Sequence, residues 1–194
     1  MEGALMALII LFLFLRNMRS TLIVFTAIPL SIVATFILLY FNGSTLNLIT
    51  MGGLALGLGR MIDDSIVVFE NIYRHRTLGL SAMDAALTGA SEVGAAVMAS
   101  TLTMIAVFLP IVFTEGISAV IFKPLALTVG FAVTCSLLVA LTVVPLMSSR
   151  MLTDRSMARK NEGGRIYRLT EGFGNWLDNL GERYKNIVAW SLGN

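Results

Sequence analysis

The sequence predicts an all-α integral membrane protein, a bundle of about five transmembrane helices followed by a C-terminal amphipathic helix. Of its 194 residues, 56% are hydrophobic and only 13% are charged, and the mean hydropathy is +0.82. Soluble domains are nearer half apolar and a quarter charged, so this composition indicates a membrane protein. The bilayer offers backbone groups no water, so the apolar runs are expected to be helices rather than strands.

Five apolar segments form the predicted bundle, which occupies residues 1–152. A helix needs about 20 residues to cross the hydrocarbon core. The first segment is shorter than that, and the basic residues follow it instead of preceding it, unlike a signal peptide. We therefore expect it to be the second half of a longer helix, truncated at its N-terminus. The predicted spans cover residues 4–15, 21–41, 46–69, 94–113 and 125–147.

Basic residues gather in alternate connections between these segments. Arg16 and Arg19 follow the first segment, and Arg74 and Arg76 follow the third. The tail after the fifth segment is also rich in arginine, whereas Lys123 is the only basic residue in the other two connections. Basic connections stay in the cytoplasm. The pattern predicts a multi-pass protein of the inner membrane with a cytoplasmic C-terminal tail.

Two stretches outside the spans have helical patterns of their own. Ser81, with Asp84 three residues later, predicts a capped helix start that lies along the cytoplasmic face and leads into the next span. After a cytoplasmic linker at residues 153–163, residues 164–194 repeat apolar positions every three or four residues. They predict an amphipathic helix in the membrane interface and the start of a further span. A soluble helix packed on a cytoplasmic domain is the alternative.

The third segment carries three charged residues, Arg60, Asp63 and Asp64. A charge at the centre of a membrane helix costs about 2.5–3.5 kcal/mol on insertion scales, so such residues usually face a bundle interior and mark an ion or proton path. Arg60 lies three and four residues before the aspartates and can reach both along one helix face. Two adjacent carboxylates in a poorly solvated site cannot both ionise easily, so one of them can carry a proton. The alternative is a structural ion pair that eases insertion.

Small residues recur every four positions on the same segment, at Gly53 and Gly57 and at Ala55 and Gly59. Such spacing lets membrane helices approach closely, so we expect this helix to be packed among others.

Cysteine and histidine offer no site of their own. The lone Cys135 excludes an internal disulfide, and a single histidine cannot build a Cys/His metal cluster. We expect His75 to be an ordinary surface residue, and we expect no metal, no cofactor and no nucleic-acid partner.

Beyond these physical arguments, the stretch "GLALGLGRMIDDSIVVFENIYRHR" closely resembles the fourth transmembrane helix of resistance-nodulation-division (RND) efflux pumps of the hydrophobe/amphiphile, AcrB-like branch. "FLFLRNMRSTLIVFTAIPLSIVATF", "ASTLTMIAVFLPIVF" and "VTCSLLVALTVVPLMSSRML" resemble the same family. The similarity covers nearly the whole chain in order and spacing.

The resemblance implies a secondary active transporter rather than an enzyme: a proton antiporter that exports amphiphilic or hydrophobic multidrug substrates as a homotrimer. Asp63 and Asp64 would form its proton relay, with a lysine partner on the missing second half. The chain would be a fragment, inactive alone, covering transmembrane helices two to six of the first half. Its tail would be the interfacial helix that links the two halves.

Two departures leave alternatives open. Arg60 stands where the family usually has an apolar residue, so it either neutralises an aspartate or replaces the missing lysine. The large extracytoplasmic loops that bind substrate are absent from the sequence. A non-transporting membrane sensor or regulatory module similar to sterol-sensing domains is the alternative function, and a non-functional truncation is a third. The paired aspartates favour transport, because a lipid-sensing bundle does not need them.

Overall fold

The computed structural model describes residues 18–152, which form four α-helices joined by short connections. The helices are α2 (Met18–Phe41), α3 (Leu48–Thr77), α4 (Ala82–Val112) and α5 (Ile117–Met151). The described residues contain no strand, in agreement with the predicted all-α class. The predicted first segment, the cytoplasmic linker and the amphipathic tail lie outside these residues.

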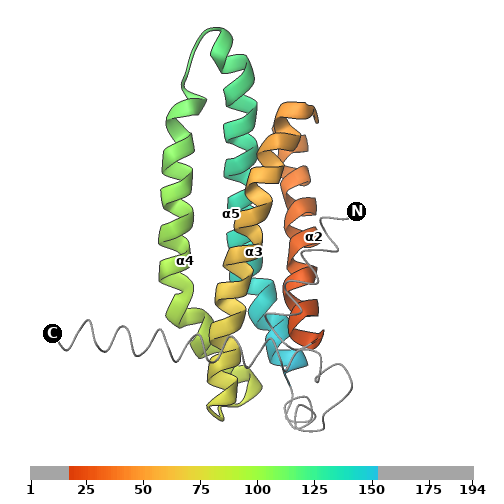
Figure 1. Ribbon diagram of the computed structural model, residues 1–194, viewed down its shortest axis with the longest axis vertical. Coiled ribbons are helices and arrows are strands. Elements are labelled where there is room, and N and C mark those ends of the chain that lie inside the picture. The colour runs from red at the N-terminus through yellow and green to blue at the C-terminus, as the bar shows by residue number, and fades with distance from the viewer. Residues whose placement is uncertain (1–17, 153–194) are drawn as a thin grey trace, which may run out of the picture. The chain divides into compact units, whose positions relative to one another are not determined.

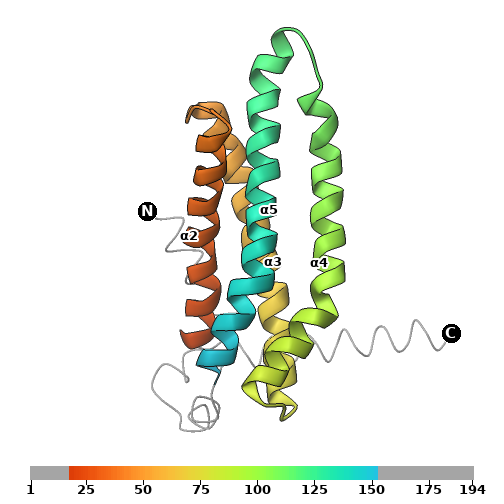
Figure 2. The same ribbon diagram turned by 180° about the vertical axis from the view of Figure 1, so that it is seen from behind.

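The helices run alternately up and down, with α3 and α5 at the centre of the bundle. Helix α2 lies on one side of this central pair and α4 on the other (Figure 1 and Figure 2). The contact between α3 and α5 is the most extensive of those between α3, α4 and α5. The side chains that fill the core of this pair are fully buried and mostly β-branched or small; they include Met61, Val68, Val129, Ala132 and Val133.

Three of these helices are long and apolar enough to cross a membrane by length and composition: α2 from Thr21 onward, α4 and α5. Helix α3 has 30 residues, which is ample length, but Arg60, Asp63 and Asp64 make it less apolar than the others. The neighbouring helices shield part of its polar surface, and its crossing of the membrane stays a prediction.

The helices extend beyond the predicted spans. Helix α5 begins at Ile117, eight residues before the predicted segment, because Gly116 has a φ of 84° that turns the chain immediately. The predicted cap at Ser81 is confirmed, and its hydroxyl accepts a hydrogen bond from the backbone N–H of Asp84 at 3.1 Å. The capped turn is continuous with the following helix, however, and α4 bends in its first turns instead of breaking (Figure 2).

Close approach between helices depends on glycines at three positions. Gly53 and Gly57 face Thr128 and Ala132 of α5, where a Cβ would lie 3.0 Å or less from the neighbouring atoms. Of the two small-residue pairs in the sequence, only this one packs in the described bundle, since Ala55 and Gly59 are exposed. Gly89 of α4 lies against the backbone of α3 at Ile72.

We predict that Gly89→Ala destabilises the bundle. A Cβ at position 89 would lie 2.7 Å from Ile72 Cα and 2.8 Å from Ile72 N, so two backbones would have to separate. Overpacking of this kind costs about 1–3 kcal/mol. The measurement is the thermal unfolding midpoint of the chain in detergent micelles.

Gly130→Ala is the matched control, because a Cβ at this helical position has no neighbouring atom within 4 Å. It should leave the midpoint unchanged or raise it slightly, since alanine is favoured over glycine in helices by about 0.5–1 kcal/mol. Equal midpoints for the two variants would show that α3 and α4 do not approach as closely as described.

Candidate functional site

The charged residues of α3 lie at different depths in the bundle. The side chain of Asp64 is 2% exposed, Arg60 is 28% exposed, and Asp63 is on the exposed side of the helix. Successive helical residues point roughly 100° apart, so neighbouring aspartates cannot share one face. The sequence therefore placed the three charges together correctly, but only one aspartate enters the bundle.

Asp64 is held by one cation and one hydroxyl. Nη2 of Arg60 lies 3.1 Å from Oδ1 of Asp64 across one turn of α3. On the other carboxylate oxygen, the hydroxyl of Ser136 on α5 donates a hydrogen bond to Oδ2 at 3.2 Å. Both carboxylate oxygens are thus satisfied inside the bundle. Among the described residues, Arg60 makes its ion pair with Asp64 and none with Asp63, although the sequence spacing allows both.

Helix α4 joins this site through Ser100, whose hydroxyl accepts a hydrogen bond from Nη2 of Arg60. The site therefore draws polar groups from three helices: α3, α4 and α5. Sequence reasoning did not identify Ser100 or Ser136. Serine and threonine in membrane helices commonly bond their own preceding turn, as Thr103 does here with Ala99, so a hydroxyl in an apolar run does not by itself indicate a site.

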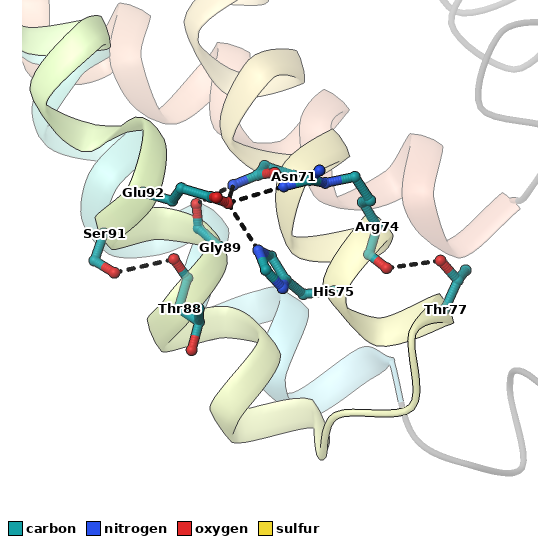
Figure 3. A network of polar contacts seen from close by, with 8 residues as sticks. All are labelled: Asn71, Arg74, His75, Thr77, Thr88, Gly89, Ser91 and Glu92. Carbon is teal, nitrogen blue, oxygen red and sulfur yellow. Dashed lines mark hydrogen bonds and ion pairs between the residues drawn. The ribbon is translucent and has the colours of Figure 1, made fainter.

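A second polar cluster lies where α3 ends and α4 begins (Figure 3). Three side chains of α3 converge on a single atom of α4, Oε2 of Glu92. The distances to it are 2.7 Å from Asn71 Nδ2, 2.8 Å from His75 Nε2 and 3.0 Å from Arg74 Nη2. Asn71 also donates to the backbone carbonyl of Gly89 at 2.9 Å, so the cluster joins the two helices where Gly89 packs against α3.

The prediction that His75 is an ordinary surface residue is wrong. Its side chain is only 15% exposed and is paired with Glu92. The partner is 17 residues away in sequence, so no local spacing indicated it. At the same end of the bundle, buried Arg76 donates from Nε to the carbonyl of Leu152 at 2.8 Å and so ties α3 to the end of α5.

Glu92 lies outside the apolar part of its helix, near the basic end of the bundle. Hydrogen bonds from His75 and then from Asn71 lower its pKa from the ordinary 4.5 to about 2. Arg74 adds a smaller electrostatic contribution in the same direction. Glu92 therefore stays negatively charged at neutral pH and accepts hydrogen bonds from the three donors of α3.

No metal centre accompanies these two clusters in the described part of the chain, where no three His, Cys, Asp or Glu side chains come together. The polar chemistry consists of carboxylates, cations and hydroxyls between helices. This combination defines a class: multi-pass helical membrane proteins with ionisable groups inside the bundle, where such groups usually serve ion or proton movement.

Comparison with known proteins identifies the family. The model of the AcrB/AcrD/AcrF family matches residues 1–194, and the chain belongs to this family of RND efflux transporters. It is 36% identical over 188 residues to the multidrug resistance protein MdtC of Yersinia enterocolitica, which covers 97% of the chain and 18% of that protein. It is 37% identical over 187 residues to MdtC of Citrobacter koseri, covering 96% of the chain and 18% of the relative.

The family predicted from the "RMIDDSIVVFEN" motif is thereby confirmed. The chain spans less than a fifth of the length of these relatives.

We predict that the contact between the ends of α3 and α4 weakens in acid. The folded-state pKa of Glu92 is depressed. Its contribution to the stability of the α3–α4 contact is therefore fully present above pH 4.5 and is lost as pH falls toward 2. Glu92→Gln should remove this pH dependence. Hydrogen exchange of the backbone amides at the α3–α4 connection, measured across this pH range, checks it.

Glu70→Gln is the control, because Glu70 is an exposed glutamate on α3 that makes no ion pair with another described residue. It should keep the acid-induced increase in exchange. The same increase in Glu92→Gln as in the wild type would contradict the assigned role of Glu92.

Proposed function

We propose that this chain forms the proton-responsive membrane part of an RND efflux pump for multidrug or amphiphilic substrates. The observation that carries the proposal is the Asp63–Asp64 pair, with Asp64 buried against Arg60 and Ser136 and Asp63 at the surface of the same helix. Carboxylates so placed in a membrane bundle are typical of proton relays. The printed names of the relatives, which are multidrug resistance proteins, support the substrate class.

The relay would act through the contacts of α3. Adding a proton to an aspartate removes a negative charge and weakens its attraction to a nearby cation. Because α3 packs on both α4 and α5, a change in that attraction would alter how the three helices are held together. Packed helices respond to such changes by shifting between discrete arrangements, which is how a proton event can be coupled to movement.

The exposed face of α3 supports a partner helix outside the described bundle. Gly52, Ala55, Gly59 and Asp63 lie on the exposed surface of α3, and small residues there permit close approach. A helix carrying a cation would neutralise Asp63. In the proposed assembly it comes from the second half of the pump, and the whole pump is a homotrimer in the inner membrane with the tail of this chain in the cytoplasm.

We predict that the chain alone does not export substrate and that Asp63→Asn or Asp64→Asn abolishes export in a complete pump. The chain would replace the matching segment of the Citrobacter koseri MdtC relative, and dye efflux driven by a proton gradient would be measured in proteoliposomes. Each substitution removes a titratable group at nearly constant shape, so efflux should fall to the level of empty vesicles.

Glu70→Gln provides the same carboxylate-to-amide change on the same helix and should leave efflux unchanged. Efflux by both asparagine variants at the rate of the unsubstituted chimera would show that the relay assignment is wrong.

A further inference from the structure

We propose that the end of the bundle where α2 ends and α3 begins binds the headgroup of an anionic phospholipid, with Lys123 of α5 as the cation of the site. The site is a surface cavity of about 360 Å³ between the α2–α3 connection and the first turns of α5. Neither aspartate of α3 lines this cavity, so the site is independent of the proposed relay.

The walls of the cavity come from two segments of different character. The α2–α3 connection supplies polar residues, among them Ser44 and Asn47, whereas α5 supplies Lys123 and apolar residues such as Val120 and Leu127. The α4–α5 hairpin extends beyond the α2–α3 connection, so α5 passes this connection along its side and can form a wall (Figure 1 and Figure 2). The volume lies in the range of small-molecule sites. A cavity with one polar and one apolar wall suits the headgroup end of an amphiphile.

The polar wall offers hydrogen-bond donors. The side-chain oxygen of Asn47 caps α3 and accepts from the backbone N–H groups of Ile49 and Thr50 at 2.9 and 3.0 Å. Its side-chain nitrogen has no partner in the part of the chain that the structure describes. The hydroxyl of Ser44 accepts from Asn42 at 3.0 Å and keeps its own proton to donate. No carboxylate is among the residues that line the cavity, so its free polar groups suit an anion.

Lys123 has no counter-ion in the bundle. Within residues 21–152, its ammonium group makes no ion pair and no hydrogen bond, and its side chain is exposed. The other charged residue at this end is Glu115, which lies in the α4–α5 connection and does not line the cavity. An unpaired ammonium group beside free donors attracts a phosphate, whose oxygens accept charge-assisted hydrogen bonds.

The apolar surroundings favour a phospholipid over a free phosphate ion. Ser44 also lines a neighbouring cavity of about 630 Å³, whose other walls are aliphatic and aromatic side chains that include Phe36, Ile37 and Tyr40. Helix α2 is long and apolar enough to cross a membrane, and it ends beside both cavities, at the level expected for lipid headgroups. A phospholipid would place its phosphate at Lys123 and an acyl chain in the apolar cavity, whereas a free phosphate would leave that cavity empty.

The test is native mass spectrometry of the full chain in detergent micelles, titrated with phosphatidylglycerol, which is anionic, or with phosphatidylcholine, which has no net charge. The wild type should bind the first phosphatidylglycerol more tightly than the first phosphatidylcholine. Lys123→Gln removes the charge at similar length and should weaken phosphatidylglycerol binding about fivefold, the contribution typical of one basic residue at an anionic membrane surface. Lys123→Arg keeps a cation and should keep the affinity.

Arg150→Gln is the matched control, because Arg150 is an exposed cation at the opposite end of α5. It should leave the affinity for the first phosphatidylglycerol unchanged. Equal weakening in Lys123→Gln and Arg150→Gln would overturn the proposal, since binding would then follow net charge alone. Equal affinities of the wild type for the two lipids would overturn it as well.

Asn47→Asp alters the polar wall and leaves Lys123 in place. Aspartate caps a helix as well as asparagine does, so α3 should keep its start, which wild-type helicity by circular dichroism would verify. The new carboxylate should repel an anionic headgroup, so phosphatidylglycerol binding should weaken while phosphatidylcholine binding stays unchanged. An unchanged affinity for phosphatidylglycerol in the folded variant would contradict the assigned cavity.

Two further measurements separate a lipid from other occupants. Inorganic phosphate, added in large excess over the lipid, should not displace bound phosphatidylglycerol. If it does, the cavity takes a free anion and the assignment to a lipid is wrong. Lys123→Gln should also weaken phosphatidylglycerol binding when the chain is part of a complete pump. Loss of that effect would show that another part of the pump covers the cavity, and the proposal would fail.

Discussion

A charge between apolar helices must be neutralised where it lies, and this constraint shapes the centre of the bundle. Arg60 and Asp64 meet it within one turn of α3, at 3.1 Å, and Ser100 and Ser136 complete the coordination from α4 and α5. Truncating one partner of such a pair is typically far more damaging than replacing both, because it leaves a bare charge. The polar contacts therefore fix the rotation of α3 about its axis, so that Asp64 points into the bundle and Asp63 lies on the exposed side.

These short polar contacts require helices that lie close together. Glycines at positions 53 and 57 let α3 approach α5, and Gly89 lets α4 approach α3. Apolar packing alone gives little preference between one rotation of a membrane helix and another, since lipid is as apolar as leucine. In this bundle, small residues set the distance between helices, and the ion pair between Arg60 and Asp64 sets the rotation of α3.

The end of the bundle where α3 ends and α4 begins is held by a different set of charges. Glu92 of α4 gathers Asn71, Arg74 and His75 of α3 on one oxygen, while Arg76 binds the carbonyl of Leu152 beyond α5. Arg74 and Arg76, from which the sequence predicts the cytoplasmic side, thus also join helices at this end. If the proposed relay moves α3, these contacts would hold this end of the helix in place while the rest of α3 shifts.

The sequence by itself determined the helical membrane class, the alternating order of the helices, the cap at Ser81 and the family, because these depend on local composition, spacing and motif. It also brought Arg60, Asp63 and Asp64 together, since a helix has a fixed period. Only the tertiary structure decided that Asp64 rather than Asp63 enters the bundle, and that Ser100, Ser136 and Glu92 are partners. Those contacts join residues 17 to 72 positions apart, and no local pattern encodes which faces of two apolar helices meet.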